Sequence, residues 1–121
     1  ITVYGTGQQS RCFTWVGDVV AALVQLSQHT EAVGEIFNIG STHEVTISEL
    51  AQHIKVMTGS QSDIILMGYD QAYESGFEDM ERRVPSLQKI HNLIGYKPTR
   101  DLNGIIADVV QFAKQKATVF R

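Results

Sequence analysis

The alternation of short β-type runs with amphipathic helical stretches is the feature that most constrains the fold of this chain. Strands are predicted over residues 1–4, 12–16, 35–39 and 63–67, where β-branched and aromatic residues gather. Helices are predicted over residues 18–27, 46–58, 86–94 and 101–113, where apolar residues recur at helical spacing. In 121 residues this order predicts one small α/β lobe with about four helices and three or four short strands.

The predicted helices have recognisable ends. The run Thr46-Ile47-Ser48-Glu49 is a capping box, in which the threonine hydroxyl and the glutamate carboxylate each bind a backbone N–H of the first turn. Gly59 is expected to end this helix. Asp18 and Ser86 are predicted as N-caps of two other helices, and Asp101 is predicted to begin the last one.

The polar stretch from Gly68 to Arg83 contains glycine and has weak periodicity, which predicts a long loop. Loops longer than about 12 residues in compact domains are often functional. Near the end of this stretch, an acidic cluster of Glu78, Asp79 and Glu81 stands beside two arginines. The cluster is expected to hold the loop by salt bridges.

Arg11 and Arg83 are the strongest candidates for ligand binding. Each is predicted to lie in a loop before a helix, and a guanidinium group offers a planar fork of donors that suits phosphate or carboxylate oxygens. The two are expected to converge on one multiply charged anion; the alternative is that both are solvated surface residues. Arg82 is expected to point elsewhere, because successive side chains diverge in an extended segment.

Composition and charge argue against several other classes of protein. The net charge is −3 and the basic residues do not cluster, which argues against a nucleic-acid surface. No apolar run has membrane-spanning length, and there is no signal-peptide pattern, so a cytoplasmic location without a membrane partner is expected. Cys12, the single cysteine, is expected to be a small hydrophobe rather than a nucleophile. The four histidines lack ligand spacing, so no metal site is predicted.

Four segments carry motifs in order along the chain. The first, residues 1–23, has its pattern at Tyr4, Gly5, Gly7, Gln9, Arg11, Phe13, Trp15, Val16 and Asp18. The second is Asn38-Ile39-Gly40 with a helix opening at Thr46, and the third is Arg83-Val84-Pro85-Ser86, followed by a helix and then by the fourth, residues 93–98. Together these segments, which cover about residues 1–115, resemble the C-terminal half of the extended short-chain dehydrogenase/reductases, which are NAD-dependent epimerases, dehydratases and decarboxylases of nucleotide sugars.

The same resemblance implies that the chain is a fragment. It has no glycine-rich GxxGxxG turn between a strand and a helix, and no Tyr-x-x-x-Lys pair for proton transfer. In the family both belong to the N-terminal Rossmann domain, which would bind NAD in the full-length enzyme. Residues 1–121 are therefore expected to be the substrate-binding domain, inactive and without cofactor when alone, from an enzyme that is a homodimer. The apolar faces of helices 18–27 and 101–113 are expected to contact the missing domain.

The resemblance also implies roles for individual residues. Arg11 would bind phosphate on the first loop, and Arg83 would reach phosphate or sugar from the opposite side, with a possible accessory role in catalysis. Four further residues have both a functional and a structural interpretation. Gln9 would lie near ribose or phosphate, or be a surface amide of the turn. Thr2 and Tyr4 would present backbone groups to the base, or form a plain core strand. Phe77 would cover the substrate, or pack in a satellite core.

The function implied is that of an NAD-dependent nucleotide-sugar epimerase or dehydratase whose substrate is UDP- or dTDP-linked. Two alternatives remain. The segment Glu81-Arg82-Arg83-Val84-Pro85-Ser86 resembles the UDP-glucuronate decarboxylase branch of the same family. The chain is alternatively a non-enzymatic nucleotide-sugar-binding module that retains the anion cleft.

Overall fold

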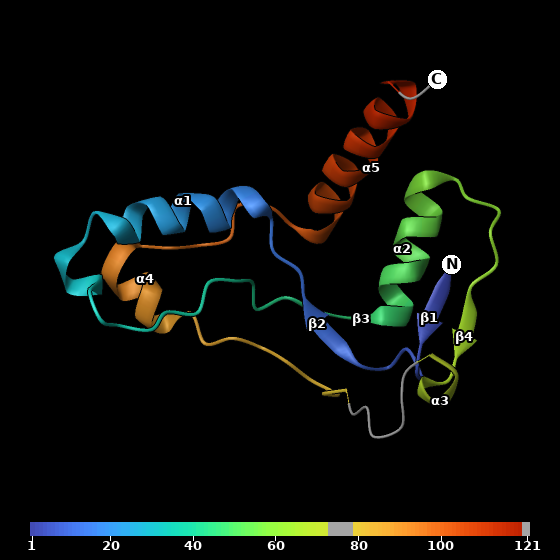
Figure 1. The fold of residues 1–121 in the computed structure, drawn as a ribbon, viewed down its shortest axis with the longest axis horizontal. Helices are drawn as coiled ribbons and strands as arrows, with labels where there is room; N and C mark the ends of the chain where they lie inside the picture. The colour runs from blue at the N-terminus through green and yellow to red at the C-terminus, as the bar shows by residue number, and fades with distance from the viewer. Residues whose placement is uncertain (73–78, 120–121) are drawn as a thin grey trace.

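The computed structural model describes residues 1–72 and 79–119, and in these residues it is an α/β structure. Figure 1 shows the helices and strands along the chain. The strands are β1 (Thr2–Tyr4), β2 (Ser10–Cys12), β3 (Glu44–Thr46) and β4 (Ile65–Met67). The helices are α1 (Val16–Ser27), the 3-10 turn η1 (Thr30–Ala32), α2 (Ile47–Thr58), α3 (Tyr69–Ala72), α4 (Gln88–Ile94) and α5 (Leu102–Val119).

The strands form two separate pairs. β1 and β4 run parallel, with Val3 opposite Leu66, whereas β2 and β3 are antiparallel, with Arg11 opposite Val45. An isolated bridge also joins Ser10 to Arg82. The segment after the long loop is thereby held against β2, which places Arg11 and Arg83 in the same region of the fold.

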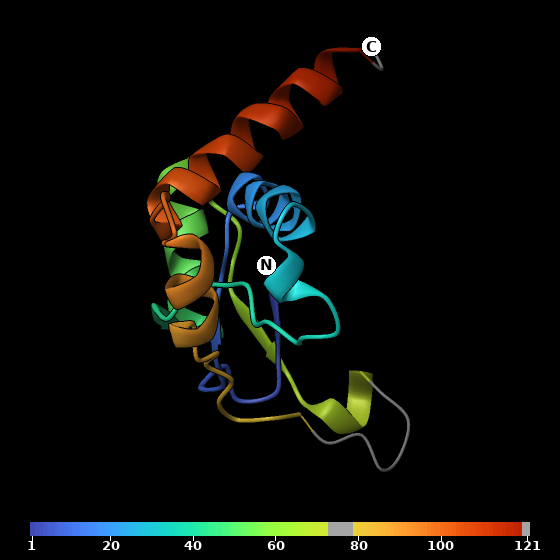
Figure 2. The ribbon, with the colours of Figure 1, turned by 90° about the vertical axis from the view of Figure 1, so that its left-hand side faces the viewer.

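The apolar core has two parts, which lie at opposite ends of the view in Figure 1. At one end α1 packs on α4, and the buried residues there are Ala22, Ile90 and Tyr96. At the other end α2 packs against β1, β3 and α5, where Val3, Ala51 and Ile106 are buried. Figure 2 shows α5 projecting from the rest of the chain toward the C-terminus.

Local signals predicted the ends of α2 correctly. The Thr46 hydroxyl accepts from the Glu49 backbone N–H at 3.1 Å, and the Glu49 carboxylate accepts from the Thr46 N–H at 2.9 Å. Gly59 ends the helix in the left-handed conformation, at φ 64°. The prediction for Asp101 is also confirmed, since its carboxylate accepts from the Gly104 N–H at 2.8 Å in the first turn of α5.

Two predicted N-caps are wrong. The N-cap of α4 is Leu87 rather than Ser86, and it makes no side-chain capping bond. The N-cap of α1 is Trp15, while Asp18 lies within the first turn and is only 5% exposed. The Asp18 carboxylate instead accepts from the Thr99 backbone N–H at 2.9 Å and from the Thr99 hydroxyl at 2.5 Å. It therefore ties the start of α1 to the connection between α4 and α5.

The predicted strands are partly corrected. Strands near residues 1–4 and 63–67 are confirmed as β1 and β4, but the second strand covers Ser10–Cys12 instead of 12–16. Residues 35–39 form no strand, because no other described segment pairs with them. β3 was not predicted from sequence, and it exists because β2 lies beside it.

Helix α1 is apolar on its solvent side as well as on its buried side. Leu23, one of the apolar residues at helical spacing in this segment, is 54% exposed. Three valines on the same helix are also exposed, namely Val16, Val20 and Val24. An apolar face of this extent is typical of a contact surface. Among the described residues, no helix has both the length and the hydropathy required to cross a membrane.

We expect Asp18→Ala to lower the free energy of unfolding by about 2 kcal/mol, because it removes two charge-assisted hydrogen bonds between a buried carboxylate and Thr99. Chemical denaturation monitored by circular dichroism measures the change. Asp108→Ala is the control, since Asp108 makes an exposed ion pair with Arg100 at 3.4 Å and such pairs contribute about 1 kcal/mol or less. Equal losses in the two variants would contradict the role given to Asp18.

Candidate functional site

Arg11 and Arg83 line one open cavity of about 560 Å³. Arg11 lies in β2, and Arg83 lies in the extended segment that leads to α4. A third wall comes from the segment that ends at Gly40. The structure thus brings the two predicted arginines together. The remaining lining residues are Cys12, Phe13, Thr14, Asn38, Ile39, Val84, Pro85 and Ser86.

The Arg11 guanidinium is held on two sides. Nη1 donates to the carbonyl oxygen of Ser10 at 2.7 Å, and Nη2 donates to the carboxylate of Asp79, with which it forms an ion pair. The Arg11 side chain is 21% exposed. Because a guanidinium has five N–H donors, these bonds fix its orientation and leave donors for a ligand.

Arg82 and Arg83 have different surroundings, as the alternation of an extended chain predicts. Arg82 donates to both carboxylate oxygens of Glu44, at 2.8 Å from Nε and 2.6 Å from Nη2. This bond lowers the pKa of the Glu44 carboxyl below its ordinary value. Within the described part of the chain, Arg83 forms no ion pair, and its side chain is exposed.

A second cavity of about 560 Å³ adjoins the Arg11–Asp79 pair and is lined by Gln9, Tyr69 and Asp79 among others. Gln9 Nε2 donates to the carbonyl oxygen of Tyr4 at 2.9 Å and to the Tyr69 hydroxyl at 3.0 Å. The Tyr69 hydroxyl in turn donates to Asp79 at 2.9 Å. A hydrogen-bonded chain therefore runs from the end of β1 to the acidic partner of Arg11.

Gly5 allows the tyrosine to take this position. Its φ is 71°, and a Cβ there would lie 2.6 Å from the Tyr69 ring. Any other residue would strain the backbone and push the ring away. The turn after β1 thus places Tyr69 beside Gln9 and Asp79.

The other predicted site residues lie apart from the arginine cavity. Gln9 lines only the second cavity, while Thr2 and Tyr4 line neither of the two. Both lie in β1, paired with Ile65 and Met67 of β4. Phe77 lies outside the described residues. Sequence reasoning did not identify Tyr69, and it assigned Asp79 to a local acidic cluster rather than to Arg11; no signal in the sequence connects Asp79 with a residue so distant along the chain.

The cavity wall includes the only cysteine. Cys12 is partly buried, and burial followed by the negative charge of Glu44 raises the pKa of its thiol. A raised pKa keeps the sulfur protonated and weakly nucleophilic near neutral pH. Among residues 1–72 and 79–119, no group of histidine, cysteine and carboxylate side chains has an arrangement that would hold a metal ion.

The turn Gly5-Thr6-Gly7 does not fit a dinucleotide. A phosphate cradle needs open space where glycine lacks a side chain, with a helix N-terminus directly behind the turn. Here the Tyr69 ring fills the space at Gly5, and the Ser48 hydroxyl fills the space at Gly7, 2.0 Å from an added Cβ. The turn leads into β2 rather than a helix. This turn is therefore not a dinucleotide phosphate cradle.

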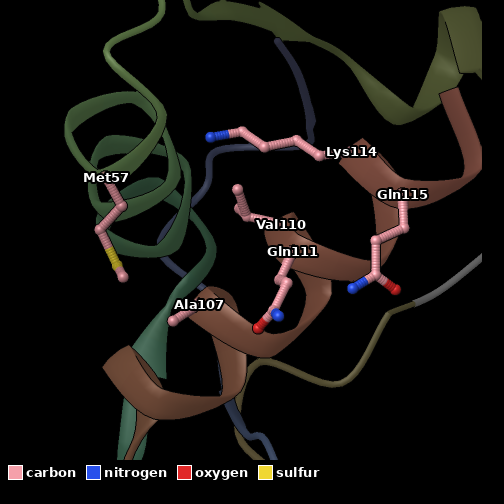
Figure 3. A pocket seen from close by; sticks show the side chains of 6 residues that line it. All are labelled: Met57, Ala107, Val110, Gln111, Lys114 and Gln115. Carbon is pink, nitrogen blue, oxygen red and sulfur yellow. The ribbon is translucent and has the colours of Figure 1, made fainter. Parts of the chain in front are cut away.

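A third cavity, of about 470 Å³, lies between α2 and α5 and has a different character (Figure 3). Met57 projects from α2 toward Ala107 and Val110 of α5, with glutamine side chains and Lys114 at the margin. It has no arginine in its lining. Nothing in this groove resembles the paired guanidinium groups of the first cavity.

Comparison with known proteins identifies the class. Residues 1–109 match the family described as GDP-mannose 4,6 dehydratase. The chain is 34% identical over 115 residues to the UDP-N-acetyl-alpha-D-glucosaminuronate decarboxylase of Bacillus cytotoxicus, covering 95% of this chain and 36% of that protein. It is also 34% identical over 112 residues to UDP-glucuronic acid decarboxylase 1 of Danio rerio, covering 93% of this chain and 25% of that protein.

Solved structures agree on the fold. An epimerase from Methanothermobacter thermautotrophicus superimposes with a TM-score of 0.87 at 22% identity, over 98% of this chain and 34% of that one. The dTDP-glucose 4,6-dehydratase of Bacillus anthracis, solved in complex with NAD, gives a TM-score of 0.78 at 23% identity, over 94% of this chain and 34% of that one.

The fold and the matched segments are those of extended short-chain dehydrogenase/reductases that act on nucleotide sugars. The chain belongs to the GDP-mannose 4,6-dehydratase family, as its match over residues 1–109 shows. It spans 25% to 36% of the length of the curated relatives it matches.

We expect Cys12 to react slowly with iodoacetamide near neutral pH, and Glu44→Gln to make the reaction faster. Removing the Glu44 charge lowers the thiol pKa, so a larger fraction is thiolate at any pH below that pKa. A pH series of alkylation rates, followed by mass spectrometry, measures the shift. Glu35→Gln, which removes a carboxylate paired with Lys89, is the control and should leave the rate unchanged. An unchanged rate in Glu44→Gln would show that burial alone sets this pKa.

Proposed function

We propose that this chain is the substrate-binding domain of an NAD-dependent nucleotide-sugar epimerase or dehydratase, and that it binds the pyrophosphate of the substrate. The observation that carries the proposal is the presence of Arg11 and Arg83 in the wall of one cavity. Family membership supports the enzyme class. NAD would be held by another part of the full-length protein and would supply the hydride chemistry there.

The chemistry of the cavity suits a pyrophosphate. Such a group carries about two negative charges, and guanidinium donors bind phosphate oxygens in a bidentate way. Arg11 is oriented by the Ser10 carbonyl, so it would lose little freedom on binding. Arg83 faces the cavity from another segment and would bind the second phosphate or the sugar. The two residues would grip and orient the substrate, and Arg83 would have at most an accessory role in catalysis.

Other residues are proposed to contact the base and the ribose of the substrate. UDP- and dTDP-sugars are the proposed substrates, with Gln9 near the ribose or phosphate and Thr2 and Tyr4 presenting backbone groups to the base. Phe77 is proposed to cover the substrate. For the whole protein we propose a cytoplasmic homodimer.

A decarboxylase is the second candidate, because two relatives at 34% identity carry that name. Their names specify uronic-acid substrates, whose extra carboxylate would suit a cavity with two cations. Product analysis with UDP-glucuronate in the full-length enzyme distinguishes the branches, since decarboxylation releases CO₂ whereas epimerisation retains the carboxylate.

We expect Arg11→Ala and Arg83→Ala each to weaken UDP binding by about 1.5 to 3 kcal/mol, the scale of a charge-assisted hydrogen bond. Isothermal titration calorimetry measures the change. Arg82→Ala is the matched control and should have a smaller effect, because Arg82 is bound to Glu44 outside this cavity. Arg11→Lys should restore only part of the affinity, since lysine lacks the fork. Equal losses at all three arginines would argue for general charge attraction instead of a site.

We also expect the 121-residue chain to be catalytically silent when incubated with NAD and UDP- or dTDP-sugars. The Gly5-Thr6-Gly7 turn does not fit a dinucleotide, and the sequence has neither a GxxGxxG turn nor a Tyr-x-x-x-Lys pair. NADH absorbance and chromatography of the sugar nucleotides are the measurements. Clear turnover by the purified chain would refute the proposal that it supplies substrate binding alone.

A further inference from the structure

Asp79 forms an ion pair with the Arg11 guanidinium, the group that the proposed function assigns to the substrate phosphate. We propose that Asp79 is a built-in competitor for the anion: its carboxylate neutralises Arg11 in the free protein, and a nucleoside diphosphate binds there by displacing it. The proposal rests on the proposed function, because it takes Arg11 as the phosphate ligand. It adds a residue that determines affinity and a change that accompanies binding.

The geometry supports competition. A carboxylate and a phosphate oxygen seek the same guanidinium N–H groups, and Asp79 already accepts from Nη2 of Arg11. The Ser10 carbonyl engages the other terminal nitrogen, at 2.7 Å. A phosphate that takes this Nη2 donor displaces Asp79, and a phosphate bound to a neighbouring N–H of Arg11 lies beside the negative charge of Asp79.

The position of the ion pair also indicates a role in the shape of the site. Arg11 lines the first cavity and Asp79 lines the second, while the two side chains contact each other. The pair thus stands between the two cavities. Displacing Asp79 would separate the two side chains that meet between the cavities.

The Asp79 carboxylate has a second hydrogen-bond partner in addition to Arg11. The Tyr69 hydroxyl donates to its second oxygen at 2.9 Å, and Gln9 binds that hydroxyl in turn. Tyr69 lies in α3, directly after β4. When the carboxylate leaves Arg11 it retains the tyrosine as a donor, so its charge is not left without a partner.

The opposite role, in which Asp79 positions Arg11 for the ligand, predicts the opposite result for one substitution. Asp79→Asn keeps the shape and the ability to accept a hydrogen bond but removes the charge. A competitor predicts that UDP and inorganic pyrophosphate bind more tightly, by roughly three- to tenfold, the scale of one partly exposed ion pair. A positioning role predicts weaker binding.

The experiment is calorimetric titration of UDP and of pyrophosphate into the 121-residue chain at fixed ionic strength, with folding checked by circular dichroism. Glu81→Gln is the matched control. Like Asp79→Asn, it removes one negative charge from the lining of the second cavity, but Glu81 forms no ion pair with Arg11. A gain in Asp79→Asn well above the gain in Glu81→Gln supports the proposal. Equal gains, no gain or a loss overturns it while the proposed phosphate site stands.

Two further variants test whether the gain in affinity depends on Arg11 and on the charge of Asp79. In the Arg11→Ala background, Asp79→Asn should give no gain, because the group for which the two anions compete has gone. Tyr69→Phe removes one support of the Asp79 carboxylate without changing charge, and its effect on affinity should be smaller than that of Asp79→Asn. Binding by Asp79→Asn but not by the unmodified chain also supports the proposal. Absence of binding in both overturns the proposed function for this chain, and the competitor role with it.

Discussion

The two hydrogen bonds from Thr99 to the buried carboxylate of Asp18 hold the arrangement of this lobe together. Asp18 lies in the first turn of α1 and is 5% exposed, while Thr99 lies in the connection from α4 to α5. A buried carboxylate is costly unless donors surround it, and Thr99 supplies both its N–H and its hydroxyl. Beside this bond, Tyr96 donates to the carbonyl oxygen of Gly40 at 2.8 Å, and burial together with the Asp18 charge raises the pKa of the tyrosine. Gly40 is part of the arginine cavity, so the core interaction extends to the wall of the candidate site.

The sequence predicted elements whose causes are local and failed where the cause is distant. The capping box at Thr46 and the left-handed Gly59 involve residues close in the chain, and both were predicted correctly. Asp18 looked like a cap by the same local rule, but its partner is Thr99. Strands show the same limit, because a β-type run becomes a strand only where a neighbour pairs with it. Residues 35–39 have no such neighbour among the described residues, and β3 has one in β2.

For the candidate site, the sequence predicted which arginines belong to it but not which distant residue binds Arg11. Resemblance to a family identified Arg11 and Arg83, and the fold brings them to one cavity. The divergence of Arg82 followed from the geometry of an extended chain, and its partner is Glu44. The link from Arg11 to Asp79 could not be predicted, because it depends on how β2 and the end of the long loop meet at the bridge between Ser10 and Arg82. Any of three acidic residues in that loop satisfied the sequence pattern equally well.

The charges around β2 are compatible with the proposed anion site, although the chain is acidic overall. Two arginines near this strand each have a carboxylate partner, yet the pairs differ in geometry. Arg82 uses Nε and Nη2 on both oxygens of Glu44, a bidentate pair that joins β3 to the segment before α4. Arg11 binds Asp79 through one nitrogen and the Ser10 carbonyl through another. Each arginine uses two donors in these bonds and both carry the same charge, so their positions distinguish them: Arg11 lines the cavity and Arg82 does not. The proposed phosphate role of Arg11 therefore depends on where the fold places its guanidinium.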